Sequence, residues 1–170
     1  MLEVVDNFVS NYYCDKLYEL FLQRIGKFPW YISETNPIKN DLNVAEPLKE
    51  KYFYFVHNLL RDNNQSSQFD CIEPLLEKIK YDSLIRVKAN CYLKGEKLIQ
   101  HEWHRDYQYK HYGALFYVNT CDGFTEFECG TKVSCVRNRI VFFDPSKKHR
   151  SSNTTNCPFR FTINLNYHRL

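Results

Sequence analysis

The pattern of the chain changes after residue 83, and this change most limits the folds that are open to it. Turn-forming pairs such as Asp122-Gly123 and Asp144-Pro145 separate short runs rich in β-branched and aromatic residues. These runs span about 84–93, 111–119, 124–128, 131–136, 139–143 and 158–167. Close-set short strands of this kind pair in antiparallel sheets. We therefore expect an antiparallel double sheet.

The chain before residue 83 shows mainly helical patterns. Ser10 is suited to cap a helix that ends near Gly26, because apolar residues recur at helical spacing between them. Two further stretches with helical spacing predict helices. The remaining expectations are, in chain order, a short strand at 30–32, a loop over 33–47, helices at 48–61 and 71–80, and a polar connection at 62–67 between those two helices. We expect one domain over residues 1–170, with helical support over 1–82 and a β core over 83–170.

Bulk properties exclude several classes of protein. A net charge of +3 in 170 residues does not by itself indicate nucleic-acid binding. The seven cysteines include no CxxC pair, which argues against a zinc ribbon and a disulfide framework. We see no signal peptide and no apolar run of membrane-spanning length. These observations predict a cytoplasmic protein that does not bind membranes, of cellular or viral origin.

Four residues of the second half suggest metal chemistry. His104 and Asp106 project to the same side of a locally extended segment, because side chains alternate along a strand. His149 follows a strand and a turn, and two imidazoles with one carboxylate suit non-haem iron. Arg160 lies between two phenylalanines of a strand, where burial of a cation is costly unless an anion pairs with it. An arginine can bond both oxygens of a carboxylate.

At this point the sequence resembles the iron(II)- and 2-oxoglutarate-dependent dioxygenases, in particular their prolyl 4-hydroxylase-like branch. The resemblance covers about residues 84–168. It includes Arg86-Val87-Lys88-Ala89-Asn90-Cys91-Tyr92, the HxD pair, Leu115-Phe116-Tyr117-Val118-Asn119, and the turn Asp122-Gly123-Phe124-Thr125. In that turn, Phe124 replaces the second glycine of the family pattern.

The resemblance implies an α+β fold: a double-stranded β-helix, or jelly roll, of antiparallel strands backed by N-terminal helices. It implies that His104, Asp106 and His149 bind Fe(II), and that Arg160, Tyr117 and Tyr92 hold 2-oxoglutarate. The implied cofactors are Fe(II), 2-oxoglutarate and O2, with ascorbate as a candidate reductant. The implied reaction hydroxylates an aliphatic C–H bond of a protein or peptide and releases succinate and CO2.

Several alternatives stay open on the sequence alone. The protein could be a jelly-roll binding module without catalysis, or it could oxidise a free amino acid or a nucleic acid. His101 could be a metal ligand, although a surface or supporting role is favoured. The aromatic residues at 103, 107, 109 and 112 could line a substrate groove or fill the end of the fold. The basic cluster over 137–150 is interpreted as a solvated rim, with an acidic substrate as the alternative. The substrate and the oligomeric state are left undetermined.

Overall fold

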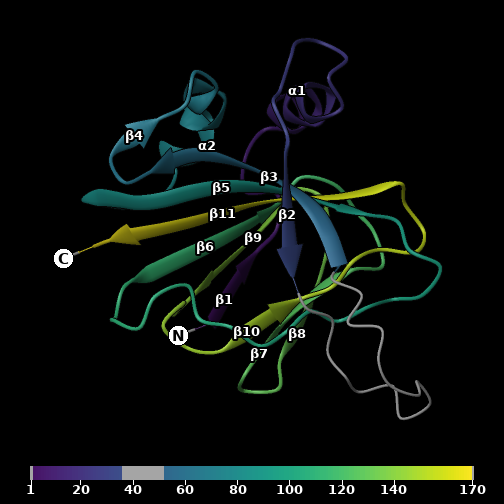
Figure 1. Cartoon of the computed structure of the whole chain (residues 1–170). Coiled ribbons are helices and arrows are strands. Elements are labelled where there is room, and N and C mark those ends of the chain that lie inside the picture. The colour runs from purple at the N-terminus through teal and green to yellow at the C-terminus, as the bar shows by residue number, and fades with distance from the viewer. Residues whose placement is uncertain (1, 36–51, 170) are drawn as a thin grey trace.

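The structure is a computed structural model, and it describes residues 2–35 and 52–169. Within these residues it contains two sheets and three short helical segments (Figure 1). The elements are β1 (Leu2–Val5), α1 (Asn11–Phe21), β2 (Tyr31–Thr35), β3 (Tyr52–Arg61), β4 (Asn64–Gln65), a 3-10 turn (Phe69–Ile72), α2 (Glu73–Leu76), β5 (Ser83–Leu93), β6 (Tyr112–Tyr117), β7 (Phe124–Phe127), β8 (Lys132–Ser134), β9 (Arg139–Phe143), β10 (His149–Ser151) and β11 (Phe159–His168).

The strands form a jelly roll of two unequal sheets. The larger sheet has eight strands in the order β1-β9-β6-β11-β5-β3-β2, with β4 paired to β3, and the smaller has the order β10-β7-β8. The pairings between these strands are antiparallel. The helices lie on one side of the larger sheet and the small sheet lies on the other (Figure 1). The expected jelly-roll fold class is confirmed.

The two faces of the larger sheet have different chemistry, because side chains alternate along each strand. On β5, Val87, Ala89 and Cys91 belong to the core on the helix side. The intervening positions of β5 are Arg86, Lys88, Asn90 and Tyr92. On β11, the core residues are Phe161, Ile163 and Leu165, and the intervening positions are Arg160, Thr162 and Asn164. Two neighbouring central strands therefore present a mostly polar face toward the small sheet.

Helix α1 begins where the sequence predicts and ends earlier. The side chain of Ser10 accepts a hydrogen bond from the backbone N–H of Tyr13, as expected of an N-cap. The helix buries Cys14, Leu17 and Phe21 against the sheet. It ends at Phe21, five residues before Gly26, because Gln23 adopts a left-handed φ of 59° that a helix cannot continue through.

The predicted helix at 48–61 is wrong over its described part. Residues 52–61 form β3, which lies between β2 and β5 in the larger sheet. The stretch Tyr-Phe-Tyr-Phe-Val has high strand propensity, and pairing on both sides overrides the apolar spacing that resembled a helix. Most of the predicted loop at 33–47 lies outside the described residues, and its first three residues belong to β2.

Other differences are smaller. The predicted helix at 71–80 is a 3-10 turn followed by the single turn of α2. The polar connection at 62–67 is a tight hairpin in which Asp62 and Asn63 have positive φ. Strands β1 and β10 were not expected from the sequence, and β1, β2 and β3 show that the first 82 residues also supply strands to the larger sheet. The assignment of residues 1–170 to one domain stays a prediction. Within the described residues, no helix is long and apolar enough to cross a lipid bilayer.

Candidate functional site

Three of the predicted site residues come together between the two sheets. His149 is the first residue of β10, and His104 and Asp106 lie in the segment between β5 and β6. The backbones of His104 and His149 exchange two hydrogen bonds of 3.0 Å, which places their side chains next to each other. One ligand atom from each of His104, Asp106 and His149 lies within 4.8 Å of the other two. This spacing suits a single metal ion bound by all three.

The hydrogen bonds of the two histidines leave one nitrogen of each ring for a metal. Nδ1 of His149 lies 3.1 Å from the carbonyl oxygen of Lys147, and Nδ1 of His104 lies 3.3 Å from that of Glu102. A carbonyl only accepts hydrogen bonds, so each Nδ1 carries the proton and each Nε2 keeps a lone pair. Burial and the neighbouring His104 lower the pKa of His149 to about 4. His149 is therefore neutral at pH 7, as a metal ligand must be.

Asp106 is fixed by two polar neighbours. Its Oδ1 accepts a hydrogen bond of 2.6 Å from Nη2 of Arg86, and its Oδ2 accepts one of 3.1 Å from Nδ2 of Asn164. Burial by itself would raise the pKa of Asp106, but Arg86 and the two histidines outweigh it and hold the pKa far below its usual range. The carboxylate is ionised at any physiological pH.

Arg160 is fully buried, and its hydrogen bonds go to neutral oxygens. Nη1 donates to Oγ of Ser151 at 2.6 Å and to the carbonyl oxygen of Ser152 at 3.2 Å. Nη2 donates to Oγ1 of Thr125 at 3.1 Å and to the carbonyl oxygen of Phe124 at 3.3 Å. Among the described residues, no carboxylate forms an ion pair with Arg160. A buried cation with only neutral partners favours binding of an anion from outside the chain.

The two predicted tyrosines flank this guanidinium. Cζ of Arg160 lies 5.1 Å from the ring centroid of Tyr92 and 5.5 Å from that of Tyr117. Burial raises the pKa of Tyr117 to about 12, so its hydroxyl stays protonated and can donate a hydrogen bond. The structure thus brings Arg160, Tyr117 and Tyr92 into one group, as the sequence predicts.

A pocket connects the metal-ligand candidates with the surroundings of Arg160. Its lining residues are Tyr54, Lys88, Asn90, Tyr92, His101, His104, Leu115, Thr125, Phe143, His149, Ser151, Thr162 and Asn164. His104 and His149 are at the metal-ligand group, whereas Tyr92, Thr125 and Ser151 contact Arg160. This pocket therefore adjoins both a metal position and the residues that surround a buried cation.

His101 belongs to this pocket and is neither exposed nor part of the metal-ligand group. It is buried against the rings of Tyr52 and Tyr92, with centroid distances of 4.9 and 5.1 Å. Its Nε2 is buried without a hydrogen-bond partner. Burial, Arg160 and His104 lower the pKa of His101 to about 3. The sequence favoured a surface or supporting role over metal ligation; the surface alternative is wrong, and the buried position fits the supporting one. The buried ring supports the pocket and keeps one polar atom free for a ligand.

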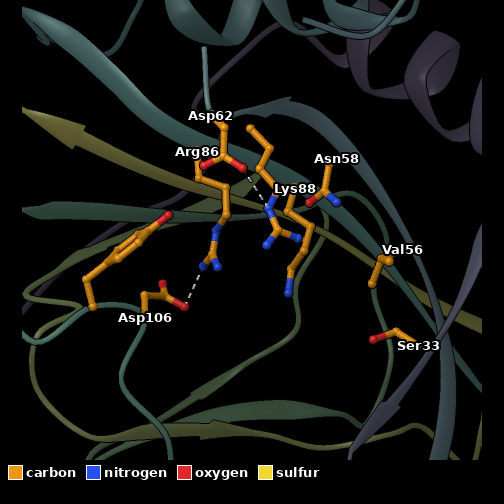
Figure 2. Close-up of a pocket in the computed structure, with 9 residues that line it drawn as sticks. Ser33, Val56, Asn58, Asp62, Arg86, Lys88 and Asp106 are labelled. Atoms are coloured by element: carbon orange, nitrogen blue, oxygen red, sulfur yellow. Dashed lines mark hydrogen bonds and ion pairs between the residues drawn. The ribbon is translucent and has the colours of Figure 1, made fainter. Parts of the chain in front are cut away.

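A second cleft is lined by Asp106 and shares Lys88 with the first pocket, and sequence reasoning missed its cations. The cleft encloses about 400 Å³ and is lined by Ser33, Val56, Asn58, Arg61, Asp62, Arg86, Lys88, Asp106 and Tyr107. The guanidinium of Arg86 and the amine of Lys88 extend into it from β5 (Figure 2). The alternation of charged residues with Val87 and Ala89 was a usable signal, because it places both cations on the site face of the strand.

The basic cluster at 137–150 forms ion pairs within the protein. The sequence alone suggested solvated cations, but four of them have acidic partners within 4 Å: Arg137 with Asp15, Arg139 with Asp6, Lys147 with Glu128, and Arg150 with Glu126. Of the four nearby aromatic residues, Tyr107 lines the second cleft, whereas Tyr109 packs on His111, Tyr112 on Tyr167, and Trp103 lies under Arg150.

The residues present fit iron and 2-oxoglutarate. Two imidazoles and one carboxylate are a donor set suited to Fe(II), because they occupy one face and leave the other open. The orphaned polar atoms of the neighbouring pocket suit a small dianion with a keto group. They are Nε of Arg160, which is a donor, and Nε2 of His101, which donates in the neutral tautomer that carries its proton there.

The fold and this arrangement define a class: the chain has the fold of solved 2-oxoglutarate-Fe(II) oxygenase structures. It superposes with a TM-score of 0.68 and 10% identity on an oxidoreductase of the 2OG-Fe(II) oxygenase family from Burkholderia pseudomallei, over 99% of this chain and 85% of that one. A viral collagen prolyl hydroxylase from Paramecium Bursaria Chlorella virus-1, solved as a 2OG complex, gives a TM-score of 0.58 and 16% identity. The match covers 99% of this chain and 96% of that one.

A prolyl hydroxylase from Trichoplax adhaerens, in complex with a hypoxia inducible factor peptide fragment, gives a TM-score of 0.56 and 13% identity, over 98% of this chain and 83% of that one. No protein-family model and no curated protein matches the sequence. At these identities the structural likeness establishes the fold, which is the fold that the sequence resemblance predicts.

Proposed function

We propose that the protein is an Fe(II)- and 2-oxoglutarate-dependent dioxygenase that hydroxylates an aliphatic C–H bond of a protein or peptide. The observation that carries this proposal is the pocket that joins His104 and His149, which group with Asp106, to the residues that contact the buried Arg160. A metal position beside a buried cation suits a metal-bound co-substrate with a distal carboxylate.

The residues of the pocket have distinct roles in this proposal. His104, Asp106 and His149 hold the iron, and Arg160 with Tyr117 binds the distal carboxylate of 2-oxoglutarate. Tyr92 stacks beside Arg160 and, with His101, forms the apolar wall that keeps water from the guanidinium. When bound, iron and 2-oxoglutarate together supply the oxidation that inserts one oxygen atom of O2 into the substrate, with succinate and CO2 as the other products.

The surrounding residues keep these ligands in place. Arg86 and Asn164 orient the two oxygens of Asp106, and the backbone pairing of His104 with His149 fixes the spacing of the imidazoles. The second cleft is lined by Asp106 and adjoins the co-substrate pocket at Lys88, and we assign it to the substrate. Two relatives in fold are prolyl hydroxylases, one solved with a peptide, and this supports a peptide substrate.

The test is succinate formation. The protein is loaded with Fe(II) and 2-oxoglutarate without oxygen, and succinate is measured after oxygen is admitted. We expect slow uncoupled turnover in the wild type, and none in Asp106→Ala or Arg160→Ala. Binding of iron and of 2-oxoglutarate is measured in parallel by calorimetry.

The outcomes separate the candidates. Turnover in the wild type alone supports the oxygenase. A wild-type protein that binds neither iron nor 2-oxoglutarate contradicts it and favours the jelly-roll binding module. Equal turnover in Asp106→Ala shows that adventitious iron, and not this site, produces the succinate.

A further inference from the structure

The second cleft contains two cations: Arg86, which the proposed function uses only to orient Asp106, and Lys88, to which it gives no role. Arg86 and Lys88 lie two residues apart on β5 and line the cleft beside Asp106 (Figure 2). Arg61 is at the rim, where it pairs with Asp62 at 3.4 Å, and both side chains are largely exposed. The unbalanced positive charge therefore lies at the inner end, next to the candidate metal ligands.

The position of Lys88 is unfavourable for an ammonium group unless an anion binds in the cleft. Lys88 occupies a central strand, opposite Asn164 on β11 and Asn58 on β3. Among the described residues, Lys88 forms no ion pair. Its Nζ lies 6.0 Å from the ring centroid of Tyr54. A partly buried ammonium at this position favours an anion bound beside it.

Arg86 links the cleft to the metal-ligand group. One of its terminal nitrogens bonds Asp106 at 2.6 Å, and its guanidinium stacks on Tyr107 with Cζ 5.3 Å from the ring centroid. Its Nε is buried without a partner. An anion that contacts both Arg86 and Lys88 is therefore held next to Asp106, which is the position that a substrate must reach.

On these observations we propose that the cleft walled by Arg86 and Lys88 binds a carboxylate of the substrate, close to the carbon that is hydroxylated. This inference rests on the proposed function and names the substrate class. Arg86 already pairs with Asp106, so Lys88 is the cleft cation without an ion-pair partner among the described residues, and one carboxylate of a substrate is enough to pair with it. Asn58 and Ser33 supply further hydrogen-bonding groups, and about 400 Å³ accommodates more than the carboxylate alone.

The carboxylate can belong to an acidic residue of a peptide or to a free amino acid, and the experiment has one arm for each source. Binding is measured by calorimetry to the intact chain loaded with Fe(II) and 2-oxoglutarate without oxygen. The first arm uses capped pentapeptides with a central proline and one glutamate, each paired with its glutamine counterpart. The second arm uses the twenty free amino acids, each paired with its amide.

We expect at least one acidic probe to bind roughly 10- to 100-fold more tightly than its neutral partner, the range for a hydrogen-bonded charge pair. The arm in which this occurs identifies the source of the carboxylate. Lys88→Met, and Lys88→Gln as a second neutral variant, should remove the preference, whereas Lys88→Arg should keep most of it. Lys80→Met, a matched change at an exposed lysine outside the cleft lining, should keep all of it.

Two results overturn the inference: acidic probes that bind no more tightly than their partners in both arms, or a preference that survives in Lys88→Met and Lys88→Gln. If either result accompanies normal binding of 2-oxoglutarate and succinate formation, the proposed function stands and only the substrate class is wrong. A chain that binds neither iron nor 2-oxoglutarate overturns both.

Discussion

At the scale of single residues, Gly123 is fixed by its contact with Arg160. A Cβ added at Gly123 would lie 2.5 Å from Cδ of Arg160 and 2.5 Å from the carbonyl oxygen of Asn153, too close for either to stay in place. We expect Gly123→Ala to displace the guanidinium and to weaken 2-oxoglutarate binding at least about tenfold, since charge-assisted hydrogen bonds are lost. Calorimetric titration of the iron-loaded protein measures the change.

The matched control is Gly26→Ala, because a Cβ there would lie 3.4 Å from Cδ1 of Leu20, an ordinary contact. A loss of affinity is informative only if the variant folds, so the midpoint of thermal unfolding is measured for both variants. An affinity in Gly123→Ala equal to that of the wild type would show that Arg160 does not bind the co-substrate.

His101 gives the unliganded protein a pH dependence. Burial lowers its pKa from the ordinary 6.5 to about 3, so between these values the unfolded chain binds a proton that the folded chain does not. The free energy of unfolding therefore rises with pH in this window and falls on acidification, by up to about 1.4 kcal/mol per pH unit for one group. Urea unfolding at a series of pH values from 6 to 4 measures the slope.

We expect His101→Phe to reduce this slope by the amount that corresponds to about one bound proton. Phenylalanine fits among the same aromatic rings and does not titrate. The pKa of His149 is lowered as well, so part of the pH dependence of unfolding remains in the variant. Identical slopes in the two proteins would mean that His101 is protonated in the folded state at these pH values.

At the scale of secondary-structure elements, β3 shows where sequence reasoning fails. Tyr52, Phe55, Val56, Leu59 and Leu60 have helical spacing, yet the segment is a strand. Its conformation is decided by pairing with β2 and β5, which are about 20 and 30 residues away along the chain, and a local pattern carries no information on such partners. The strands after residue 83 were predictable because each run is short, rich in strand formers and bounded by turn residues.

The site was predictable for a related reason. His104 and Asp106 are close along the chain, His149 follows a strand that the pattern identifies, and Arg160 lies inside another. The roles of Arg86 and Lys88 depend on which face of β5 meets the small sheet, and β5 is held in the larger sheet by its pairing with β11 and β3. The burial of His101 depends on Tyr52 of β3, which the sequence placed in a helix.

Leu59 tests the position of β3 in the core. It is fully buried with the residues that pack beneath the helices, so Leu59→Ala should lower the free energy of unfolding by about 2–5 kcal/mol. Ile32, on the neighbouring β2, is 71% exposed, so Ile32→Ala should change the free energy of unfolding by less than about 0.5 kcal/mol. Urea unfolding measures both, and equal effects would contradict the placement of β3.

At the scale of the whole molecule, the two faces of the larger sheet have different functions: one stabilises the fold and the other carries the candidate site. Its helix side carries the main apolar core, and its other side carries the candidate metal ligands, the two pockets and the buried Arg160. The buried polar groups of the site face reduce the stability of the fold, and the apolar core on the other face compensates for this. Variants on the two faces should therefore differ in which property they change.

Arg160→Met makes this division measurable, because it removes a buried cation whose hydrogen bonds go only to neutral oxygens. Without ligands we expect the variant to be at least as stable as the wild type, since desolvation of the charge is relieved and the methionine fills the same space. When 2-oxoglutarate is added at about 100 times its dissociation constant to protein that already holds iron, the free energy of unfolding should rise by about 2.7 kcal/mol in the wild type and by much less in the variant. A variant that is strongly destabilised without ligands would mean that the neutral hydrogen bonds of Arg160 hold the two sheets together, and that the cation is part of the core and not kept for an anion.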